Sequence, residues 1–372
     1  MAVTEGLSGY RYLVAGAGLS GATVARRIAE DRGDRVLVVD RRPHTGGNCR
    51  DFRSHGITVH AYGPHVFHTS IQRVWDFLSR FTQWHPFFYR VRAMIDGNEV
   101  NIPFNLDSLY KCFPPSMALM YEKKLLDTYA FGTRIVISDL LSQGDPDLRE
   151  LARFVYEKVF LGYSMKQWGK TPEELDISVS GRVPILISRD SRYFQDRYSA
   201  IPLHGYSAMI GRILDHPNIT VLTSTQARPL VDEGRWDRVY WTGAIDEFFG
   251  YSHGALPYRS LDIRYQTLDL EYYQSCAQIN FPCDHDFTRC VEYKHYLSEK
   301  SDKTIISREY AMDFEDGVNE RFYPIENEGS RELYGQYARE AEALERVTFL
   351  GRLGLFKYMN MDQVTDRALD LF

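Results

Sequence analysis

The feature that most constrains the fold is a glycine-rich turn between a short apolar strand and a helix, close to the start of the chain. Residues 12–15 (YLVA) have the apolar character of a buried strand, and residues 16–21 (GAGLSG) follow directly and match GxGxxG. Apolar residues then recur with helical spacing, and a second apolar run, residues 36–39, ends at Asp40. This order of strand, glycine turn, helix, strand and acid predicts a βαβ unit that binds a dinucleotide.

The chemistry of a dinucleotide explains this order of residues. Glycines let the turn tighten and let the backbone approach a pyrophosphate, while the helix N-terminus offers unpaired N–H groups to the phosphates. Asp40 would accept hydrogen bonds from ribose hydroxyls. A glycine turn with only a structural role is the alternative, and the complete flanking context disfavours it.

The residues after Asp40 indicate which dinucleotide binds. In NAD enzymes the second strand usually runs into another helix, whereas here Gly46 and Gly47 follow a basic stretch and precede Asn48. A glycine pair at this distance suits a backbone that folds back over a larger cofactor, and an ordinary loop is the alternative. We therefore predict FAD as the cofactor.

Composition excludes several other classes of protein. The chain of 372 residues has a formal net charge of −6, which argues against a general binder of nucleic acid or acidic membranes. No apolar run approaches the roughly 18–20 residues of a membrane span, and the N-terminus does not resemble a signal peptide. Five cysteines without a CxxC pair, and His60, His65 and His68 without matching carboxylates, predict no metal site. A reduced, cytoplasmic protein is expected.

The remaining segments predict an α/β protein built from three parts. Residues 89–102 resemble a hairpin with Asp96-Gly97 at its turn, residues 105–160 show helical apolar spacing, and residues 258–310 alternate like antiparallel strands. The prediction is a discontinuous Rossmann-like FAD-binding domain with an inserted helical domain and an antiparallel β-sheet domain. The FAD-binding domain is predicted to comprise residues 1–88, 204–243 and 312–372. The helical domain is predicted to comprise residues 104–162, and the antiparallel-sheet domain residues 89–103, 163–203 and 244–311.

Two local predictions concern ligand contacts. Residues 162–169 (GYSMKQWG) are predicted to form an aromatic-rich loop that stacks on a base and covers a sugar, with an aromatic lid packed on itself as the alternative. Asp362 is predicted to be the N-cap of a last helix that begins at Gln363. The N-terminus of that helix would stabilise negative charge on a reduced flavin ring.

Several motifs taken together resemble one family. They are the GxGxxG turn, Gly46-Gly47-Asn48, YGPHVFHT at residues 62–69, GYSMKQWG at residues 162–169 and GRLG at residues 351–354. On these motifs the chain resembles UDP-galactopyranose mutases of the bacterial type, from about residue 10 to residue 368 and nearly without gaps. GxGxxG is common to many FAD proteins, whereas YGPHxFHT and GYxxKQWG are far more specific.

The resemblance implies a non-redox isomerase that interconverts UDP-galactopyranose and UDP-galactofuranose, a reaction of cell-wall polysaccharide biosynthesis. The reaction would pass through an adduct between the sugar and N5 of reduced FAD, so no Ser, Cys or Lys nucleophile is needed. Its partners would be a nucleotide sugar of the UDP-galactose type and a second copy of the chain in a homodimer. No nucleic acid, membrane span or metal is implied.

The resemblance also implies roles for individual residues. The catalytic side chains would be Arg182, Arg289 and His68, with the two arginines stabilising the leaving diphosphate. FAD would be bound by Gly16, Gly18, Ser20, Gly21, Asp40, Arg41, Gly47, Asn48, His65, Gly351, Arg352, Tyr358, Asn360 and Met361. The nucleotide sugar would be bound by Phe160, Tyr163, Gln167, Trp168, Arg182, Tyr193, Phe194, Arg289, Tyr323, Tyr358 and Tyr89. The alternative for Arg289 is a solvated charge on the face of a strand.

Two positions depart from the bacterial pattern and leave the sugar open. Tyr89 stands where the family usually has Asn, and Asn360 stands where it usually has Asp. The same mutase chemistry on UDP-GalNAc or on a dTDP-6-deoxyhexose is therefore an alternative. An FAD-dependent amine oxidase and a flavin-less binding protein of the Rab-escort type are alternatives from other classes. An oxidase would make poor use of two arginines at a diphosphate site.

Overall fold

The computed structural model describes residues 9–174 and 184–372. Its first layer is a five-stranded parallel sheet made of β1 (Tyr12–Ala15), β2 (Val36–Val39), β12 (Ile219–Leu222), β13 (Arg238–Trp241) and β19 (Val347–Phe349). The strand order is β12-β2-β1-β13-β19, so three distant parts of the chain share one sheet. Every residue of β1 and β2 is buried, as expected of parallel strands covered on both faces.

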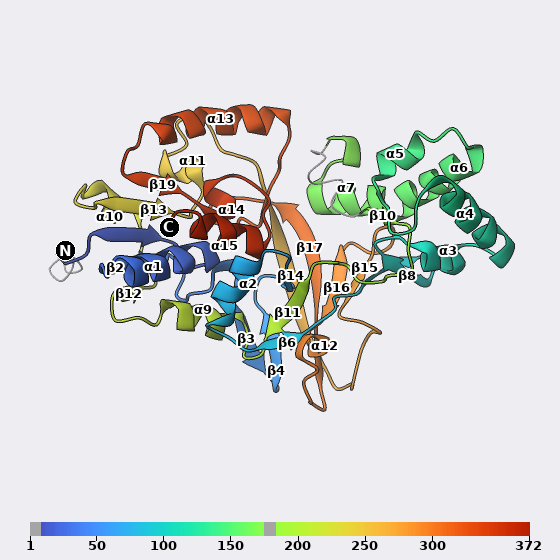
Figure 1. Ribbon diagram of the computed structural model, residues 1–372, viewed down its shortest axis with the longest axis horizontal. Helices are drawn as coiled ribbons and strands as arrows, with labels where there is room; N and C mark the ends of the chain where they lie inside the picture. The colour runs from blue at the N-terminus through green and yellow to red at the C-terminus, as the bar shows by residue number, and fades with distance from the viewer. Residues whose placement is uncertain (1–8, 175–183) are drawn as a thin grey trace.

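Helices cover this sheet on both sides. α9 (Tyr206–Leu214) and α15 (Met361–Leu369) pack against α1 (Leu19–Asp31). In Figure 1, α13 (Glu328–Glu342) lies above the strands and α9 lies below them. The predicted βαβ unit and the α/β fold class are confirmed.

A second sheet carries seven strands. These are β7 (Val91–Ile95), β8 (Asn98–Ile102), β14 (Tyr258–Leu268), β15 (Gln278–Asn280), β16 (Arg289–Glu292), β17 (Thr304–Asp313) and β18 (Tyr323–Pro324). Their order is β18-β14-β17-β16-β15-β7-β8, and all pairs are antiparallel except β7 with β15. The predicted hairpin is confirmed: Asp96 and Gly97 form its turn with φ of 48° and 81°.

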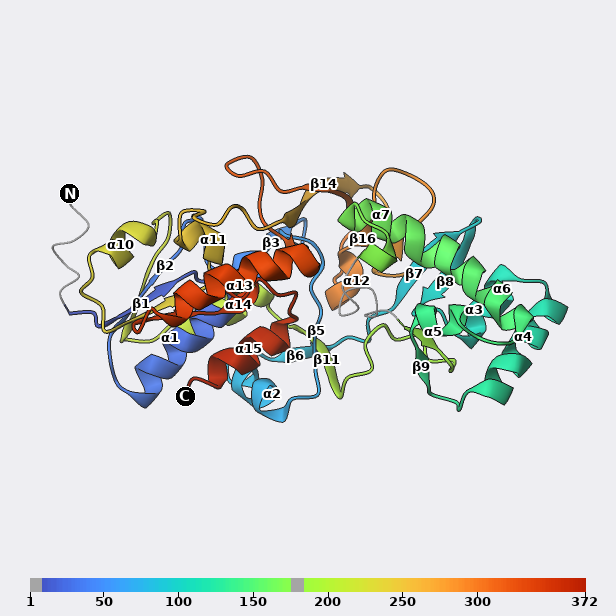
Figure 2. The same cartoon turned by 90° about the horizontal axis from the view of Figure 1, so that it is seen from above.

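A helical group occupies the end of the molecule opposite the N-terminus (Figures 1 and 2). It contains α3 (Leu106–Cys112), α4 (Pro115–Thr128), α5 (Ile137–Leu141), α6 (Pro146–Val155), the π-helical η2 (Tyr156–Leu161) and α7 (Gly162–Trp168). The predicted loop at residues 162–169 is therefore wrong. Buried positions continue with helical spacing from Val155 through Val159 to Ser164, and the helix ends only at Gly169, whose φ is 66°.

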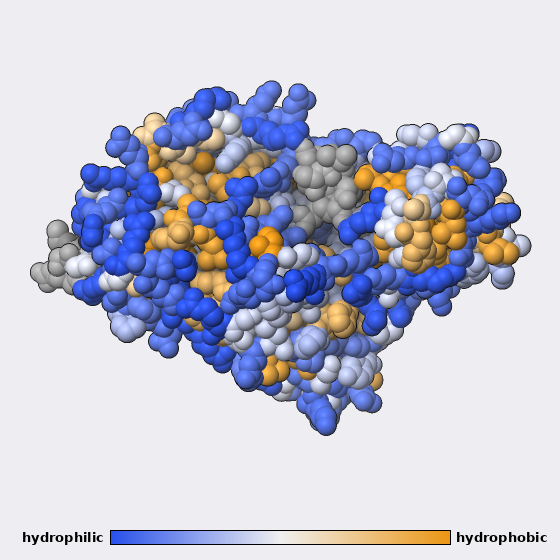
Figure 3. Space-filling view, in the orientation of Figure 1, coloured by the Kyte–Doolittle hydropathy of each residue, from blue (hydrophilic) through white to orange (hydrophobic). Residues whose placement is uncertain are grey.

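Shorter elements connect these parts. They are β3 (Asp51–Ser54), β4 (Ile57–His60), β5 (Phe67–Thr69), α2 (Gln72–Ser79), β6 (Trp84–Pro86), β9 (Arg134–Ile135), β10 (Ile185–Leu186), β11 (Tyr198–Pro202), α10 (Arg228–Asp232), α11 (Ile245–Phe248), α12 (Lys294–Leu297) and α14 (Gly351–Gly354). Figure 3 shows a face with apolar areas over the half that contains the parallel sheet and over the helical group, with hydrophilic side chains around them. Across the described residues, no helix has both the length and the apolar character needed to span a membrane. The predicted domain boundaries stay a prediction.

Candidate active site

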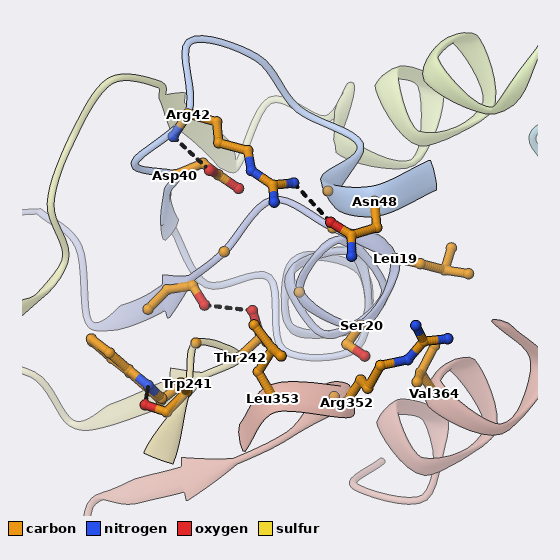
Figure 4. Close-up of a pocket in the computed structure, with 18 of the residues that line it drawn as sticks. Leu19, Ser20, Asp40, Arg42, Asn48, Trp241, Thr242, Arg352, Leu353 and Val364 are labelled. Atoms are coloured by element: carbon orange, nitrogen blue, oxygen red, sulfur yellow. Dashed lines mark hydrogen bonds between the residues drawn. The ribbon is translucent and has the colours of Figure 1, made fainter. Parts of the chain in front are cut away.

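A cavity of about 240 Å³ opens at the carboxyl ends of β1, β2 and β13, the edge where ligands bind in open α/β sheets. We call it the glycine-loop cavity (Figure 4). Of the predicted cofactor residues, its lining includes Gly16, Gly18, Ser20, Gly21, Asp40, Arg41, Gly47, Asn48, His65, Gly351, Arg352, Asn360 and Met361. The fold thus brings together, around one cavity, residues from both ends of the chain.

Two glycine loops form the floor of this cavity and leave it open. Gly16 has a φ of 109°, and a Cβ on Gly21 would lie 2.0 Å from the Gly16 carbonyl oxygen. A Cβ on Gly47 would lie 3.0 Å from the Cα of Gly18, so the second loop lies directly against the first. The N–H of Gly46 donates to the Ala17 carbonyl at 2.9 Å and fastens the two loops together. Larger residues here would displace the backbone that a pyrophosphate must approach.

The N-terminus of α1 faces the same cavity. Gly18 is its N-cap, no side chain among the described residues caps it, and its first turn carries no acid. The N–H groups of that turn are therefore available to an anion, and the helix dipole favours negative charge there. In Figure 4, Ser20 at the start of α1 lies near Arg352. These features fit the pyrophosphate of a flavin dinucleotide.

The Asp40 carboxylate holds the glycine turn in place. Its Oδ2 accepts the N–H of Ala17 at 2.8 Å, and its Oδ1 accepts the backbone N–H of Arg42 at 2.9 Å. Arg42 also donates to Asn48 Oδ1 at 3.0 Å (Figure 4) and to Glu320 at 2.8 Å. Sequence analysis did not identify Arg42 or Glu320, and only the fold brings Glu320 to this edge. Each Asp40 oxygen keeps a second lone pair, and ribose binding by Asp40 stays a prediction.

The N-terminus of α15 also lines this cavity, and its cap differs from the prediction. Asn360, not Asp362, is the N-cap: its backbone is extended, and it forms a capping box with Gln363. Gln363 Oε1 accepts the Asn360 N–H at 2.9 Å. Asp362 already lies within the first helical turn, where its burial raises the pKa of its carboxyl.

This cap yields a stability prediction. Asn360→Ala should lower the free energy of unfolding by about 1 kcal/mol because it removes the capping side chain, whereas Asn360→Asp keeps an accepting oxygen and should be nearly neutral. Denaturant titration of the apoprotein measures both. Asn327→Ala, which removes the equivalent capping box of α13, is the matched control and should cost a similar amount without changing flavin affinity. Unchanged stability in Asn360→Ala would contradict the assigned cap.

A second cavity, of about 130 Å³, lies between the helical group and the seven-stranded sheet. We call it the Arg289 cavity. It brings together five of the predicted substrate residues, namely Phe160, Tyr163, Trp168, Tyr193 and Arg289. Its lining also includes residues that sequence analysis did not identify, namely Ala93, Ile102, Val159, Ser164, Pro172, Gln278, Asn280 and Pro282. Asn280 lies directly opposite Arg289 in the β15–β16 pair, a register that no local sequence pattern specifies.

Arg289 is a paired charge whose side chain is only 15% exposed. Its Nε and Nη2 lie 2.7 Å and 2.6 Å from Oε2 of Glu309, its cross-strand neighbour on β17. Its Nη2 also lies 3.4 Å from the Tyr323 hydroxyl. Burial opposes the charge, but the Glu309 carboxylate outweighs it, so the pKa of Arg289 lies above its usual value. The alternative of a solvated strand charge is therefore wrong. Within the described part of the chain, Glu309 Oε1 has no hydrogen-bond partner.

Aromatic rings link the two cavities. The rings of Tyr323 and Tyr358 stack with centroids 5.5 Å apart at 19°, and Trp168 meets them edge-on at 5.7 Å and 6.2 Å. The Arg352 guanidinium lies 4.7 Å from the centroid of the Tyr358 ring. Since Arg352 lines one cavity and Trp168 and Arg289 line the other, the two cavities are neighbours across Tyr323 and Tyr358.

Three other predicted substrate residues are placed differently. Gln167 is buried, and its backbone oxygen accepts from Arg259 Nε at 3.0 Å. Tyr89 is buried behind the Arg289 cavity and donates its hydroxyl hydrogen to Gln278 Oε1. Arg182 lies outside the described residues. The roles predicted for these residues stay predictions.

The two histidines of the YGPHVFHT motif with predicted roles have different surroundings. His65 lines the glycine-loop cavity and donates from Nδ1 to the Gly63 carbonyl at 2.8 Å. Its burial lowers its pKa to about 4, so its imidazole is neutral at physiological pH. His68 Nδ1 lies 2.8 Å from Asp196 Oδ2, a hydrogen bond that lowers the pKa of Asp196. The His68 and Phe194 rings stack with their centroids 3.5 Å apart, and neither residue is in the lining of the Arg289 cavity.

The class of protein follows from the fold and the first cavity. Residues 14–81 match the profile of an NAD(P)-binding Rossmann-like domain. A solved structure of reduced UDP-galactopyranose mutase aligns with a TM-score of 0.73 over 97% of this chain and 93% of its own, at 15% identity. Together with the glycine-loop cavity, these likenesses define a dinucleotide-binding protein of the Rossmann-like class.

Sequence relatives narrow the class to one family. The profile described as UDP-galactopyranose mutase matches residues 158–358. The dTDP-fucopyranose mutase of Escherichia coli is 31% identical over 370 residues, covering 97% of each chain. A Klebsiella pneumoniae protein named "Probable UDP-galactopyranose mutase" is 33% identical over 362 residues, covering 96% of this chain and 92% of its own. The chain belongs to the UDP-galactopyranose mutase family. It is an isomerase with a flavin cofactor, and these matches do not favour the oxidase and binding-protein alternatives.

Proposed function

We propose that this mutase interconverts the pyranose and furanose forms of a nucleotide sugar, with UDP-galactose as first choice, and that its active cofactor is reduced FAD. The observation that carries the proposal is Arg289, which is paired with Glu309, largely buried, and set in an aromatic cavity beside a cavity that fits a dinucleotide. A nucleoside diphosphate offers a flat ring to the aromatic walls and phosphate oxygens to the guanidinium.

The glycine-loop cavity would hold FAD through elements from both ends of the chain. The first-turn N–H groups of α1 would bind the pyrophosphate, and Asp40 would bind a ribose. Arg352 and the N-terminus of α15 would stabilise negative charge on the flavin. The chemistry that a bound, reduced flavin would supply is an electron pair for the anomeric carbon as the diphosphate leaves.

Arg289 would receive the departing diphosphate. Glu309 fixes the guanidinium through Nε and Nη2, so its other N–H groups are oriented before the ligand arrives. Charge-assisted hydrogen bonds to the phosphates would strengthen as negative charge develops on them. The hydroxyl of Tyr163, which lines the same cavity, would be a second donor, and burial raises its pKa to about 12. The aromatic layer of Trp168, Tyr323 and Tyr358 would exclude water from an opened sugar.

The sugar can be settled by product analysis. Tyr89 and Asn360, which differ from the usual residues of the family, both have partners within the protein: the Tyr89 hydroxyl binds Gln278, and Asn360 caps α15. A site that pairs fewer sugar hydroxyls discriminates less. We therefore expect UDP-galactose to be converted, and a deoxy or N-acetyl analogue to be processed within about tenfold of it, a gap of roughly 1.4 kcal/mol.

The measurement is HPLC of UDP-galactose, UDP-GalNAc and a dTDP-6-deoxyhexose, each incubated with dithionite-reduced enzyme. A preference of several thousandfold for UDP-galactose would show that Tyr89 and Asn360 do not broaden the range of sugars that the enzyme accepts. Conversion of none of these nucleotide sugars by flavin-loaded enzyme would contradict the proposed function itself.

A further inference from the structure

The Arg289 cavity has a charged side and an apolar side, and the sheet order explains the division. Arg289 on β16 reaches toward Glu309 on β17 and toward Tyr323, and therefore toward the glycine-loop cavity. On the other flank, β7 and β8 contribute Ala93 and Ile102 to the lining. A bound nucleoside diphosphate would place its phosphates at the first side and its flat ring at the second.

A series of hydrogen bonds between side chains forms the floor of the cavity between these two sides. Gln278 and Asn280 stand two residues apart on β15, so their side chains share one face of the sheet, and both line the cavity. Gln278 Nε2 donates to Asn280 Oδ1 at 2.8 Å. Behind them, the buried Tyr89 donates its hydroxyl hydrogen to Gln278 Oε1.

Each hydrogen bond in this series fixes the orientation of the side chain that makes the next one. Burial raises the pKa of Tyr89, so its hydroxyl keeps its hydrogen, and a buried hydroxyl hydrogen needs an acceptor. Gln278 Oε1 is that acceptor, which turns the Gln278 NH2 toward Asn280. The Asn280 carbonyl oxygen faces Gln278, and its planar amide therefore turns Nδ2 away from Gln278, as a donor at the cavity.

We propose that Tyr89 and Gln278 are positioning residues that fix the Asn280 amide as a hydrogen-bond donor to the base, and that this fixed donor sharpens the preference of the cavity for a pyrimidine-2,4-dione. This inference rests on the proposed function, because it concerns how the same nucleotide sugar is held at its base. Uracil and thymine both present ring carbonyls as acceptors, whereas cytosine presents an amino group in place of one of them. A donor that faces an amino group is left unpaired, which weakens binding.

Nucleoside diphosphate binding to the flavin-loaded enzyme tests the proposal without turnover. By isothermal titration calorimetry, UDP and dTDP should each bind about tenfold or more tightly than CDP. Tyr89→Phe removes only the hydroxyl, frees the Gln278 amide to turn over, and should narrow that preference to about threefold or less. The UDP and dTDP arms show whether the natural base is uracil or thymine.

Tyr198→Phe is the matched control. Tyr198 on β11 donates to Gln72 Oε1 at 2.8 Å, so this variant removes a tyrosine–glutamine bond that has no connection with the cavity. It should leave the preference for UDP over CDP unchanged. Melting temperatures of the ligand-free variants show whether both are folded.

Asn280→Asp is a second variant, because it replaces the NH2 donor with an acceptor and should move the preference toward CDP. Equal binding of UDP and CDP by the wild type would overturn the inference, as would full discrimination in a folded Tyr89→Phe variant. Either result leaves the proposed function standing if UDP still binds. Binding of no nucleoside diphosphate at all would overturn both.

Discussion

Isomerisation is expected only from enzyme whose FAD is reduced. Under anaerobic conditions the oxidised holoenzyme should convert no nucleotide sugar, and addition of dithionite should start conversion. The physical reason is that displacing a diphosphate from carbon requires an electron pair, which a reduced flavin ring can donate and an electron-poor oxidised ring cannot. Because substrate and product are isomers, conversion should continue without further consumption of reductant. HPLC of the nucleotide sugars, with the flavin absorbance recorded in parallel, measures both.

Re-oxidation by air provides the internal control. The same sample should lose activity when its flavin turns yellow and regain it after a second reduction, and free reduced FAD without protein should yield no product. Equal rates from oxidised and reduced enzyme would exclude a mechanism that depends on electron donation by the cofactor. They would leave the family assignment intact, because that assignment rests on sequence.

The sequence predicted the parts of the structure that depend on local patterns. The βαβ unit was predictable because its glycines, its helical spacing and Asp40 lie within about thirty consecutive residues, a span typical of a βαβ motif. The hairpin at Asp96-Gly97 was predictable because its turn type requires those residues. α7 was missed because glycines at both ends of GYSMKQWG resemble loop boundaries, whereas α6 continues into it through a π-helical turn.

The parts of the candidate site that were missed depend on strand register. Glu309 is the partner of Arg289 because β16 and β17 pair at that position, and Asn280 lies opposite Arg289 because β15 and β16 do. No spacing rule within one strand reveals either neighbour. The cap of α15 was placed two residues late because Asn360 and Asp362 both suit an N-cap, and the observed backbone decides between them.

The structure also changes what removal of Arg289 should do. Arg289→Ala should lower turnover by about 10²–10³-fold, because a preorganised donor to the leaving diphosphate is lost. It should also destabilise the protein by about 3–5 kcal/mol, since the fully buried Glu309 carboxylate would lose its counter-charge. Removal of a solvent-exposed arginine from a strand would change neither turnover nor stability. Steady-state kinetics of reduced enzyme and denaturant titration measure the two effects separately.

Three companion variants separate catalysis from stability. Arg289→Met combined with Glu309→Gln removes both charges, so it should recover most of the stability while turnover stays low. Arg289→Lys keeps the charge but loses the planar fork that reaches Glu309 and phosphate together, so turnover should again fall. Arg264→Ala on β14, whose side chain is 62% exposed, is the control for a solvated strand arginine and should change neither property. If Arg289→Ala is folded and nearly fully active, Arg289 serves only to neutralise Glu309, and the diphosphate is stabilised by other groups.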